Sequence, residues 1–173
     1  MRDPCNYRFA CDAMLGGLAR WLRAAGFDAS WRPDIDDWPL IRHAIREERI
    51  LLSSDTGIFR IGIVRDGEVP ALRIPNGLST HEQLALVLGH FGLSARDPRC
   101  MACGGELGEV PPEQVRSKVP PRSFAWQHRF WQCAGCGRVY WQGTHWARIA
   151  DQVRQASQSG AASAKPATNL DKG

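Results

Sequence analysis

Short apolar runs alternate with segments of helical periodicity over the N-terminal half of the chain. The apolar runs predict four strands, at 7–11, 29–32, 50–52 and 71–74. Between them, apolar positions recur every three or four residues and predict helices at 14–25, 38–48 and 80–91. Gly26 stands where a helix C′ residue belongs, and Ser79 with Glu82 forms a capping box. This order predicts an α/β fold in which helices cover both faces of a parallel sheet.

Aspartates follow the predicted strands. Asp12 and Asp55 each come after a buried strand, and Asp34, Asp36 and Asp37 follow the second one. Ligands of open parallel sheets bind beyond the carboxyl ends of the strands, so these acids should share one edge. Carboxylates held together require a cation, and oxygen ligands suit Mg²⁺ or Mn²⁺. We therefore expect a catalytic site of Asp12, Asp36, Asp37 and Asp55 that hydrolyses a phosphodiester with metal assistance.

The helix after Asp12 carries residues suited to phosphate. Gly16 and Gly17 have no side chains to obstruct an anion approaching the helix N-terminus. Arg20 and Arg23, one and two turns further on, are candidates to hold flanking phosphates.

Each of these features also has a purely structural interpretation. Asp12 alone fits a helix cap, the acids at 34–37 fit a solvated turn, and the two arginines of the helix fit an exposed face. The shared sheet edge is what favours a site over these alternatives.

Four of the six cysteines form two C-x-x-C pairs, Cys100 with Cys103 and Cys133 with Cys136. Two such pairs are typical of a closed, structural zinc site with four thiolate ligands. A redox role is the weaker alternative, because no thioredoxin-like strand and helix surround either pair.

Composition changes along the chain suggest three parts. Residues 1–96 carry the α/β pattern and residues 97–150 carry the cysteine pairs together with two Pro-Pro pairs. Residues 151–173, rich in Ala, Ser and Gln, are expected to form a short helix that fades into a disordered C-terminal tail.

The cysteine part is basic and aromatic. The segment 111–150 has six Lys or Arg residues and one acidic residue, a net charge of +5, against +4 for the whole chain. Arg129 and Arg138 alternate there with Trp131, Tyr140 and Trp141. Interleaved cations and rings hold phosphates and stack on unpaired bases, which predicts single-stranded RNA as partner. The alternative is that a small domain needs these rings for its core.

Three strings of the sequence resemble the Mut-seven C-terminal RNase family. They are D-x-M-L-G-x-L-A-R-W-L-R at 12–23, I-L-L-S-S-D at 50–55, and Y-W-x-G-x-H-W at 140–146 after the cysteine pairs. The resemblance extends over about residues 7–148 and implies a PIN-like nuclease domain followed by a zinc ribbon. It also implies Asp12 as the first metal-binding carboxylate, Asp55 as the acid after the later strand, and the acids at 34–37 near the site.

Function and location follow as expectations. A divalent-metal-dependent ribonuclease with structural Zn²⁺ and catalytic Mg²⁺ or Mn²⁺ fits best. A degenerate RNA- or ribosome-binding module is the alternative, and a phosphotransfer enzyme with Asp12 as nucleophile is disfavoured by Met14, where that chemistry often has a second aspartate. The chain lacks a membrane-length apolar run and a signal-peptide pattern, so we expect a cytoplasmic protein. Endonucleolytic or exonucleolytic cutting, DNA as substrate, and oligomeric state stay open.

Overall fold

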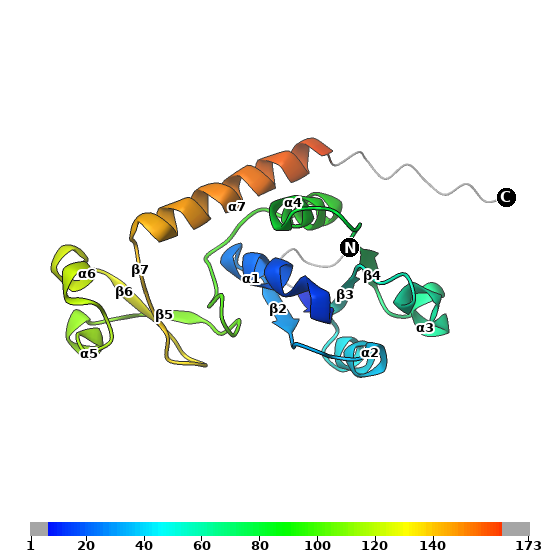
Figure 1. Cartoon of the computed structure of the whole chain (residues 1–173), viewed down its shortest axis with the longest axis horizontal. Helices are drawn as coiled ribbons and strands as arrows, with labels where there is room; N and C mark the ends of the chain where they lie inside the picture. The colour runs from blue at the N-terminus through cyan, green and yellow to red at the C-terminus, as the bar shows by residue number, and fades with distance from the viewer. Residues whose placement is uncertain (1–6, 164–173) are drawn as a thin grey trace.

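The computed structural model describes residues 7–163, without the side chains of residues 144–145 and 161–163. Its larger sheet has four parallel strands in the order β2-β1-β3-β4 (Figure 1). These are β1 (Arg8–Cys11), β2 (Asp28–Trp31), β3 (Ile50–Ser53) and β4 (Ala71–Arg73). In the register, Cys11 lies beside Trp31 on one side and Leu52 on the other. The predicted parallel sheet flanked by helices is confirmed.

Helices cover both faces of this sheet. The helical elements that connect these strands are η2 (Ala13–Leu15), α1 (Gly16–Ala24), α2 (Asp37–Arg46), η3 (Ile58–Arg60) and α3 (Gly62–Arg65), where η marks a 3-10 helix. The helix α4 (Thr80–Phe91) follows the last strand, β4. One buried cluster joins the sheet to α1 and α4, and a second joins it to α2, η3 and α3. The capping box is present, since Ser79 Oγ accepts from the Glu82 N–H and the Glu82 carboxylate accepts from the Ser79 N–H.

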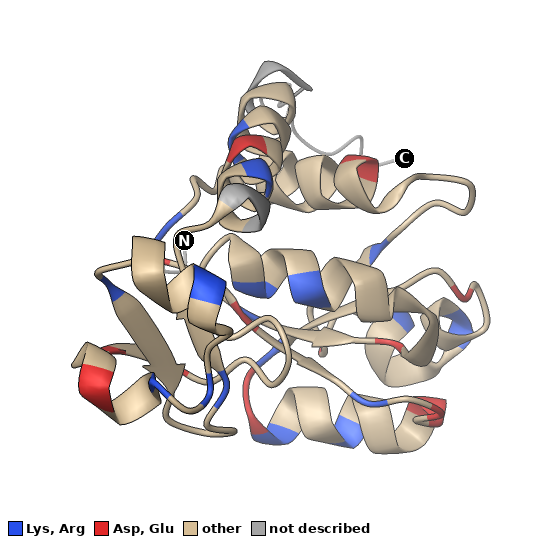
Figure 2. Ribbon diagram, turned by 60° about the vertical axis from the view of Figure 1, so that its left-hand side comes forward, with Lys and Arg blue, Asp and Glu red and all other residues tan. Residues whose placement is uncertain are grey.

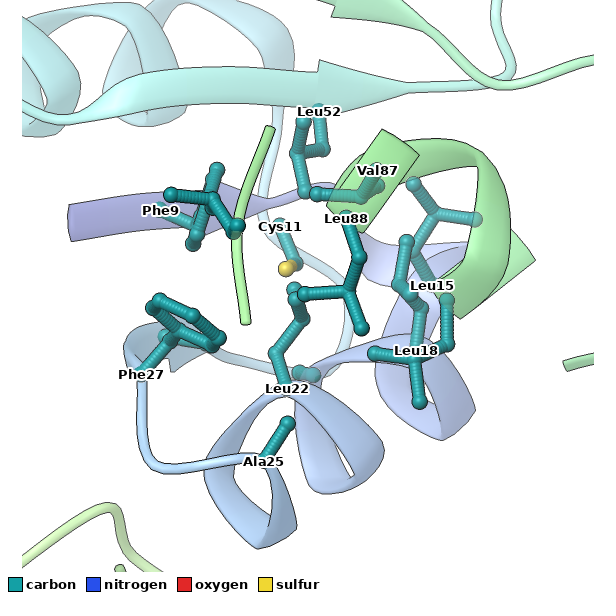
Figure 3. Close-up of a cluster of buried hydrophobic side chains, with 14 of the residues drawn as sticks. Phe9, Cys11, Leu15, Leu18, Leu22, Ala25, Phe27, Leu52, Val87 and Leu88 are labelled. Carbon is teal, nitrogen blue, oxygen red and sulfur yellow. The ribbon is translucent and has the colours of Figure 1, made fainter. Parts of the chain in front are cut away.

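The larger buried cluster surrounds Cys11. Figure 3 shows its sulfur among Phe9, Leu22, Leu52 and Leu88, which come from two strands and two helices. Burial raises the pKa of the Cys11 thiol to about 12. A thiol in this setting is a small apolar core group rather than a nucleophile.

The amino-terminal edge of the sheet holds a neutralised acid. Asp28, at the start of β2, accepts hydrogen bonds from Arg49 (2.9 and 3.0 Å) and from Arg8 (3.1 Å). Arg49 also pairs with Glu47 at 2.8 Å. Burial raises the pKa of Asp28, but its bonds to Arg49 and Arg8 outweigh burial, so the net shift is downward.

The cysteine part forms a separate antiparallel sheet in the order β5-β6-β7. It comprises β5 (Leu107–Val110), α5 (Pro112–Val115), α6 (Pro121–Trp126), β6 (Phe130–Cys133) and β7 (Val139–Trp141). Its fully described apolar core is small, with Val115, Val119 and Phe130 buried. A core of this size needs a further constraint to hold its fold.

The short helix expected from about residue 151 is part of a longer helix, so the disordered tail does not begin at residue 151. The helix α7 (Thr144–Ser163) runs along α4 (Figure 1) and buries Val153 and Ala156 in the larger core. Small residues allow this approach, because a Cβ at Gly160 would lie 2.5 Å from the Ala85 carbonyl oxygen. Residues 164–173 lie outside the described residues. No helix within 7–163, α7 included, is long and apolar enough to cross a membrane.

Candidate active site and metal centre

Asp12 lies where β1 ends and is almost completely buried. The residue is 7% exposed. One carboxylate oxygen accepts from the Ala13 N–H at 2.6 Å and so caps η2. The other accepts from the Ser53 hydroxyl at 2.6 Å. Asp12 therefore has the capping role considered from the sequence, while its second oxygen faces the neighbouring strand β3.

Ser53 connects the two strand ends. Its side chain is fully buried, and its oxygen also accepts from the Asp55 N–H at 2.9 Å. The exposed Asp55 carboxylate accepts from the Gly57 N–H at 2.7 Å, which fixes its direction. Sequence reasoning missed Ser53. The available signal was its place as the last residue of β3, two positions before Asp55.

Asp36 and Asp37 reach the same edge from the N-terminus of α2. Asp36 is the N-cap residue but makes no capping hydrogen bond with its side chain. Burial raises the pKa of Asp37, and the negative charges of Asp55, Asp12 and Asp36 raise it further. The structure thus brings three of the other predicted acids, Asp12, Asp36 and Asp55, within electrostatic reach of Asp37. Asp34 is exposed in a left-handed turn with φ of 53°.

The acidic edge, meaning Asp12, Asp36, Asp37 and Asp55, has no protein cation. Within residues 7–163, none of the four makes an ion pair with Arg, Lys or His, in contrast to Asp28 at the opposite edge. Their oxygens are more widely spaced than the cysteine sulfurs, which form the only compact ligand group found in that range.

Gly16 and Gly17 serve helix packing. A Cβ at Gly16 would lie 2.7 Å from the Trp31 ring, and Trp31 donates to the Ala13 carbonyl at 2.8 Å. A Cβ at Gly17 would lie 3.2 Å from the Thr80 hydroxyl. The directions in which a Cβ would project from these glycines are thus filled by Trp31 and Thr80, so their lack of side chains serves packing rather than making room for a phosphate.

Arg23 is also misassigned by the sequence analysis. It is 4% exposed and donates to the carbonyls of Ala29 (2.8 Å), Met101 (3.2 Å) and Ala102 (2.8 Å). The Arg99 N–H donates in turn to the Arg23 carbonyl at 2.8 Å. Arg23 therefore joins α1 to the first cysteine pair and is not free to hold a substrate phosphate.

We predict that Arg23→Met lowers the free energy of unfolding by about 2–3 kcal/mol, because it leaves buried carbonyls without their charged donor. Urea unfolding followed by circular dichroism measures this. Arg20→Met, on the same helix but exposed, is the control and should change stability by no more than about 0.5 kcal/mol. Equal stability of the two variants would contradict the assigned role.

The four cysteine sulfurs all lie within 4.8 Å of one another. Cys100 and Cys136 are 3.6 Å apart, and Cys103 and Cys133 are 3.4 Å apart. Tetrahedral zinc with Zn–S bonds of about 2.3 Å places its sulfurs about 3.8 Å apart. The donor set and its spacing therefore fit a structural zinc site, as the sequence predicts.

Hydrogen bonds lower the pKa of one thiol of this cluster. Burial raises the pKa of Cys100, but hydrogen bonds from the Tyr140 hydroxyl and from the Cys103 and Ala102 N–H groups lower it to about 6 overall. The Tyr140 oxygen lies 3.1 Å from the Cys100 sulfur. Thiolates are the form that binds metal. The same contact ties β7 to the metal centre.

The remaining residues predicted to bind RNA differ in whether their charged groups already have a partner. Arg129 is paired with Glu109 through two hydrogen bonds of 2.8 Å and lies 5.2 Å from the Trp131 ring centre. Arg20 and Arg138 are exposed and line one cleft, and neither has an ion-pair partner in the described chain. Figure 2 marks basic positions on α1 as well as in the C-terminal part.

A parallel sheet with unneutralised acids at its carboxyl edge, followed by a four-cysteine sheet, defines the class: an α/β domain joined to a small sheet whose cysteines can hold a metal ion. The chain belongs to the Mut7-C RNAse domain family, whose profile matches residues 7–153. The resemblance found in the sequence is thereby confirmed. The chain is also similar to the human protein named "Exonuclease mut-7 homolog", with 22% identity over 92% of this chain and 27% of that protein. It thus spans about a quarter of that relative's length.

Proposed function

We propose that the protein is a divalent-metal-dependent ribonuclease that hydrolyses RNA phosphodiester bonds at the acidic edge. The observation that carries the proposal is that Asp12, Asp36, Asp37 and Asp55 converge from three segments without a protein cation among the described residues. Membership of an RNase family supports RNA as substrate. The metal expected there is Mg²⁺ or Mn²⁺, since the donors are carboxylate oxygens.

The acids have different tasks in this proposal. Asp55 is exposed and oriented by Gly57, so it offers oxygens directly to an ion. Asp12 is buried and held by Ser53 and Ala13, so it provides a rigid second ligand. Asp36 and Asp37 add negative charge from the start of α2. A bound Mg²⁺ or Mn²⁺ supplies an activated water and stabilises charge on the phosphate.

The contacts of Asp12 argue against covalent phosphotransfer. Both carboxylate oxygens already accept hydrogen bonds at 2.6 Å, and only 7% of the residue is exposed. A nucleophilic oxygen must move onto phosphorus and form a covalent bond, whereas a metal ligand keeps its place and uses the remaining lone pair of a hydrogen-bonded oxygen. Two exposed apolar side chains near the acids, Met14 and Trp38, suit a nucleobase better than a small phosphate ester.

The test is cleavage of a labelled single-stranded RNA by the purified chain with Mn²⁺, with Mg²⁺ and with no added divalent metal. We expect products only when a divalent metal is added, with saturation at millimolar concentration or below. Excess Ca²⁺ serves as control, since it occupies oxygen sites with looser geometry and should support little or no cutting. RNA binding without cleavage under every metal condition would overturn the proposal and favour a non-catalytic RNA-binding module.

A further inference from the structure

A large cleft lies between the two parts of the chain. Its volume is about 830 Å³, near the upper end of the range of about 300–1,000 Å³ for ligand pockets. Its walls come from α1, from the connection at 94–102, from β7 and from α7. None of the four acids of the acidic edge lines it. The cleft is therefore distinct from the proposed catalytic centre.

The charged side chains that line the cleft are all basic. Five arginines line it, and no acidic residue of the described chain does: Arg20, Arg96, Arg99, Arg138 and Arg154. Three of them have other partners. Arg96 lies over the Phe27 ring, Arg99 donates to the Gly104 carbonyl, and Arg154 pairs with Asp151. Arg20 and Arg138 make no ion pair within residues 7–163 and come from different domains. Two free guanidinium groups in a cleft without acids complement an anion with more than one charge.

Aromatic rings form part of the same wall. Tyr140, Trp141 and Trp146 line the cleft and are all partly exposed. Tyr140 is fixed by its contact with Cys100, and Trp146 is fixed by stacking on Trp131 at 6.0 Å between ring centres. Rings held in place beside cations are the means by which proteins bind unpaired bases and their phosphates together.

The cleft continues toward the acidic edge. A smaller hollow of about 350 Å³, lined by Gly17, Arg20, Trp21 and Arg148 among others, shares Arg20 with it. Gly17 lies in the first turn of α1, five positions after Asp12. The two hollows thus follow α1 from its C-terminal half to the end that adjoins Asp12.

We propose that this cleft binds the single-stranded RNA segment that flanks the bond to be cut. The segment's phosphates lie on Arg20 and Arg138, its bases stack on Trp141 and Trp146, and the strand continues along α1 to the acidic edge. Paired bases cannot reach the rings, so the site selects unpaired strands. The inference rests on the proposed ribonuclease function for the direction of the strand, whereas binding in the cleft stands on the residues named here.

The test uses the full chain with Asp12→Asn and Asp55→Asn, so that bound RNA is not cut. Into this background we introduce Arg20→Gln with Arg138→Gln. The matched control is Lys118→Gln with Arg122→Gln, which removes two exposed charges from the basic segment without touching the cleft. Fluorescence anisotropy with a labelled single strand of about 12 nucleotides, and with its duplex, gives the dissociation constants.

We expect the cleft variant to bind the single strand at least about tenfold more weakly, and the control within about twofold. The slope of log K against log salt should fall by about 1.4 in the cleft variant, at about 0.7 for each lost phosphate contact. Equal losses in both variants, or duplex bound as tightly as single strand, would overturn the proposal.

Cleavage assays separate this proposal from the function on which it rests. If the catalytically intact chain does not cut RNA but the cleft variant still loses binding, the nuclease proposal fails and the cleft assignment holds. If the chain cuts RNA and the cleft variant cuts it with unchanged KM, the cleft assignment fails and the nuclease proposal holds.

Discussion

Replacing Asp12 and Asp55 by asparagine is expected to lower the RNA cleavage rate by about 100- to 1,000-fold or more. A catalytic metal contributes several kcal/mol of transition-state stabilisation, and each 1.4 kcal/mol is a factor of ten in rate. Asparagine keeps the size of the side chain but removes the charge that holds the ion. Cleavage rates at saturating Mn²⁺ measure the effect.

Measuring the stability of this variant distinguishes a catalytic role of Asp12 and Asp55 from a merely structural one. Asparagine is as good a helix cap as aspartate, and removing negative charge relieves the repulsion that Asp12 and Asp55 exert on Asp37. Asparagine at position 12 has only one acceptor oxygen for the Ala13 N–H and the Ser53 hydroxyl, so the loss of one buried hydrogen bond offsets this gain. We therefore expect the variant to stay folded at the assay temperature while losing activity. Asp66→Asn, an exposed acid paired with Arg65, is the matched control and should keep full activity. A variant that cuts RNA normally, or one that loses activity only because it unfolds, would refute the assignment.

The second large effect is expected at the four-cysteine site. Cys133→Ser removes one of four ligands, and structural zinc contributes about 10–16 kcal/mol of folding free energy in small metal-dependent domains. The core formed by Val115, Val119 and Phe130 is too small to replace it. We expect bound zinc to fall from about one ion per chain to almost none, and β5, β6 and β7 to lose hydrogen-exchange protection.

The parallel sheet should survive that change. Its two buried clusters contain none of the four metal-binding cysteines and take only peripheral contacts from the cysteine part, such as Met101, so amides of β1 and β3 should stay protected. Cys11→Ala is the control, because Cys11 is buried in the larger core and should leave zinc content unchanged. Full zinc content in Cys133→Ser, or protected β6 amides without metal, would contradict the prediction. Elemental analysis and hydrogen exchange provide the two measurements.

Local sequence patterns were sufficient to predict many elements of the fold. Apolar runs of strand length, apolar repeats of helical length and the Ser79 capping box depend on neighbouring residues only, so their elements could be predicted directly. The cysteine pairs are similar, because a C-x-x-C knuckle forms within one tight turn. The placement of Asp12 and Asp55 at one edge followed from a general property of parallel sheets rather than from any detail of this chain.

Contacts between distant segments decided what the sequence left open. Arg20 and Arg23 look equivalent on α1, but the carbonyls of Met101 and Ala102 close over Arg23 and leave Arg20 in the cleft. The Ser53 hydroxyl matters only because β1 and β3 are neighbours. Pairings of this kind depend on where chains far apart in sequence come together, which no local pattern records.

The C-terminal helix α7 also shows the difference between what the sequence determines and what the tertiary structure decides. By itself, the sequence determined the α/β pattern, the acids at the strand ends, the four cysteines that can hold a metal ion, and the family. It predicted only a short helix from about residue 151, yet Gly89 and Gly160 let α7 approach α4 closely enough to bury Val153 and Ala156. Only the tertiary structure could decide this, because small residues favour close helix packing just when a partner surface exists. The cleft has the same origin, since α1, β7 and α7 form its walls only after they are brought together.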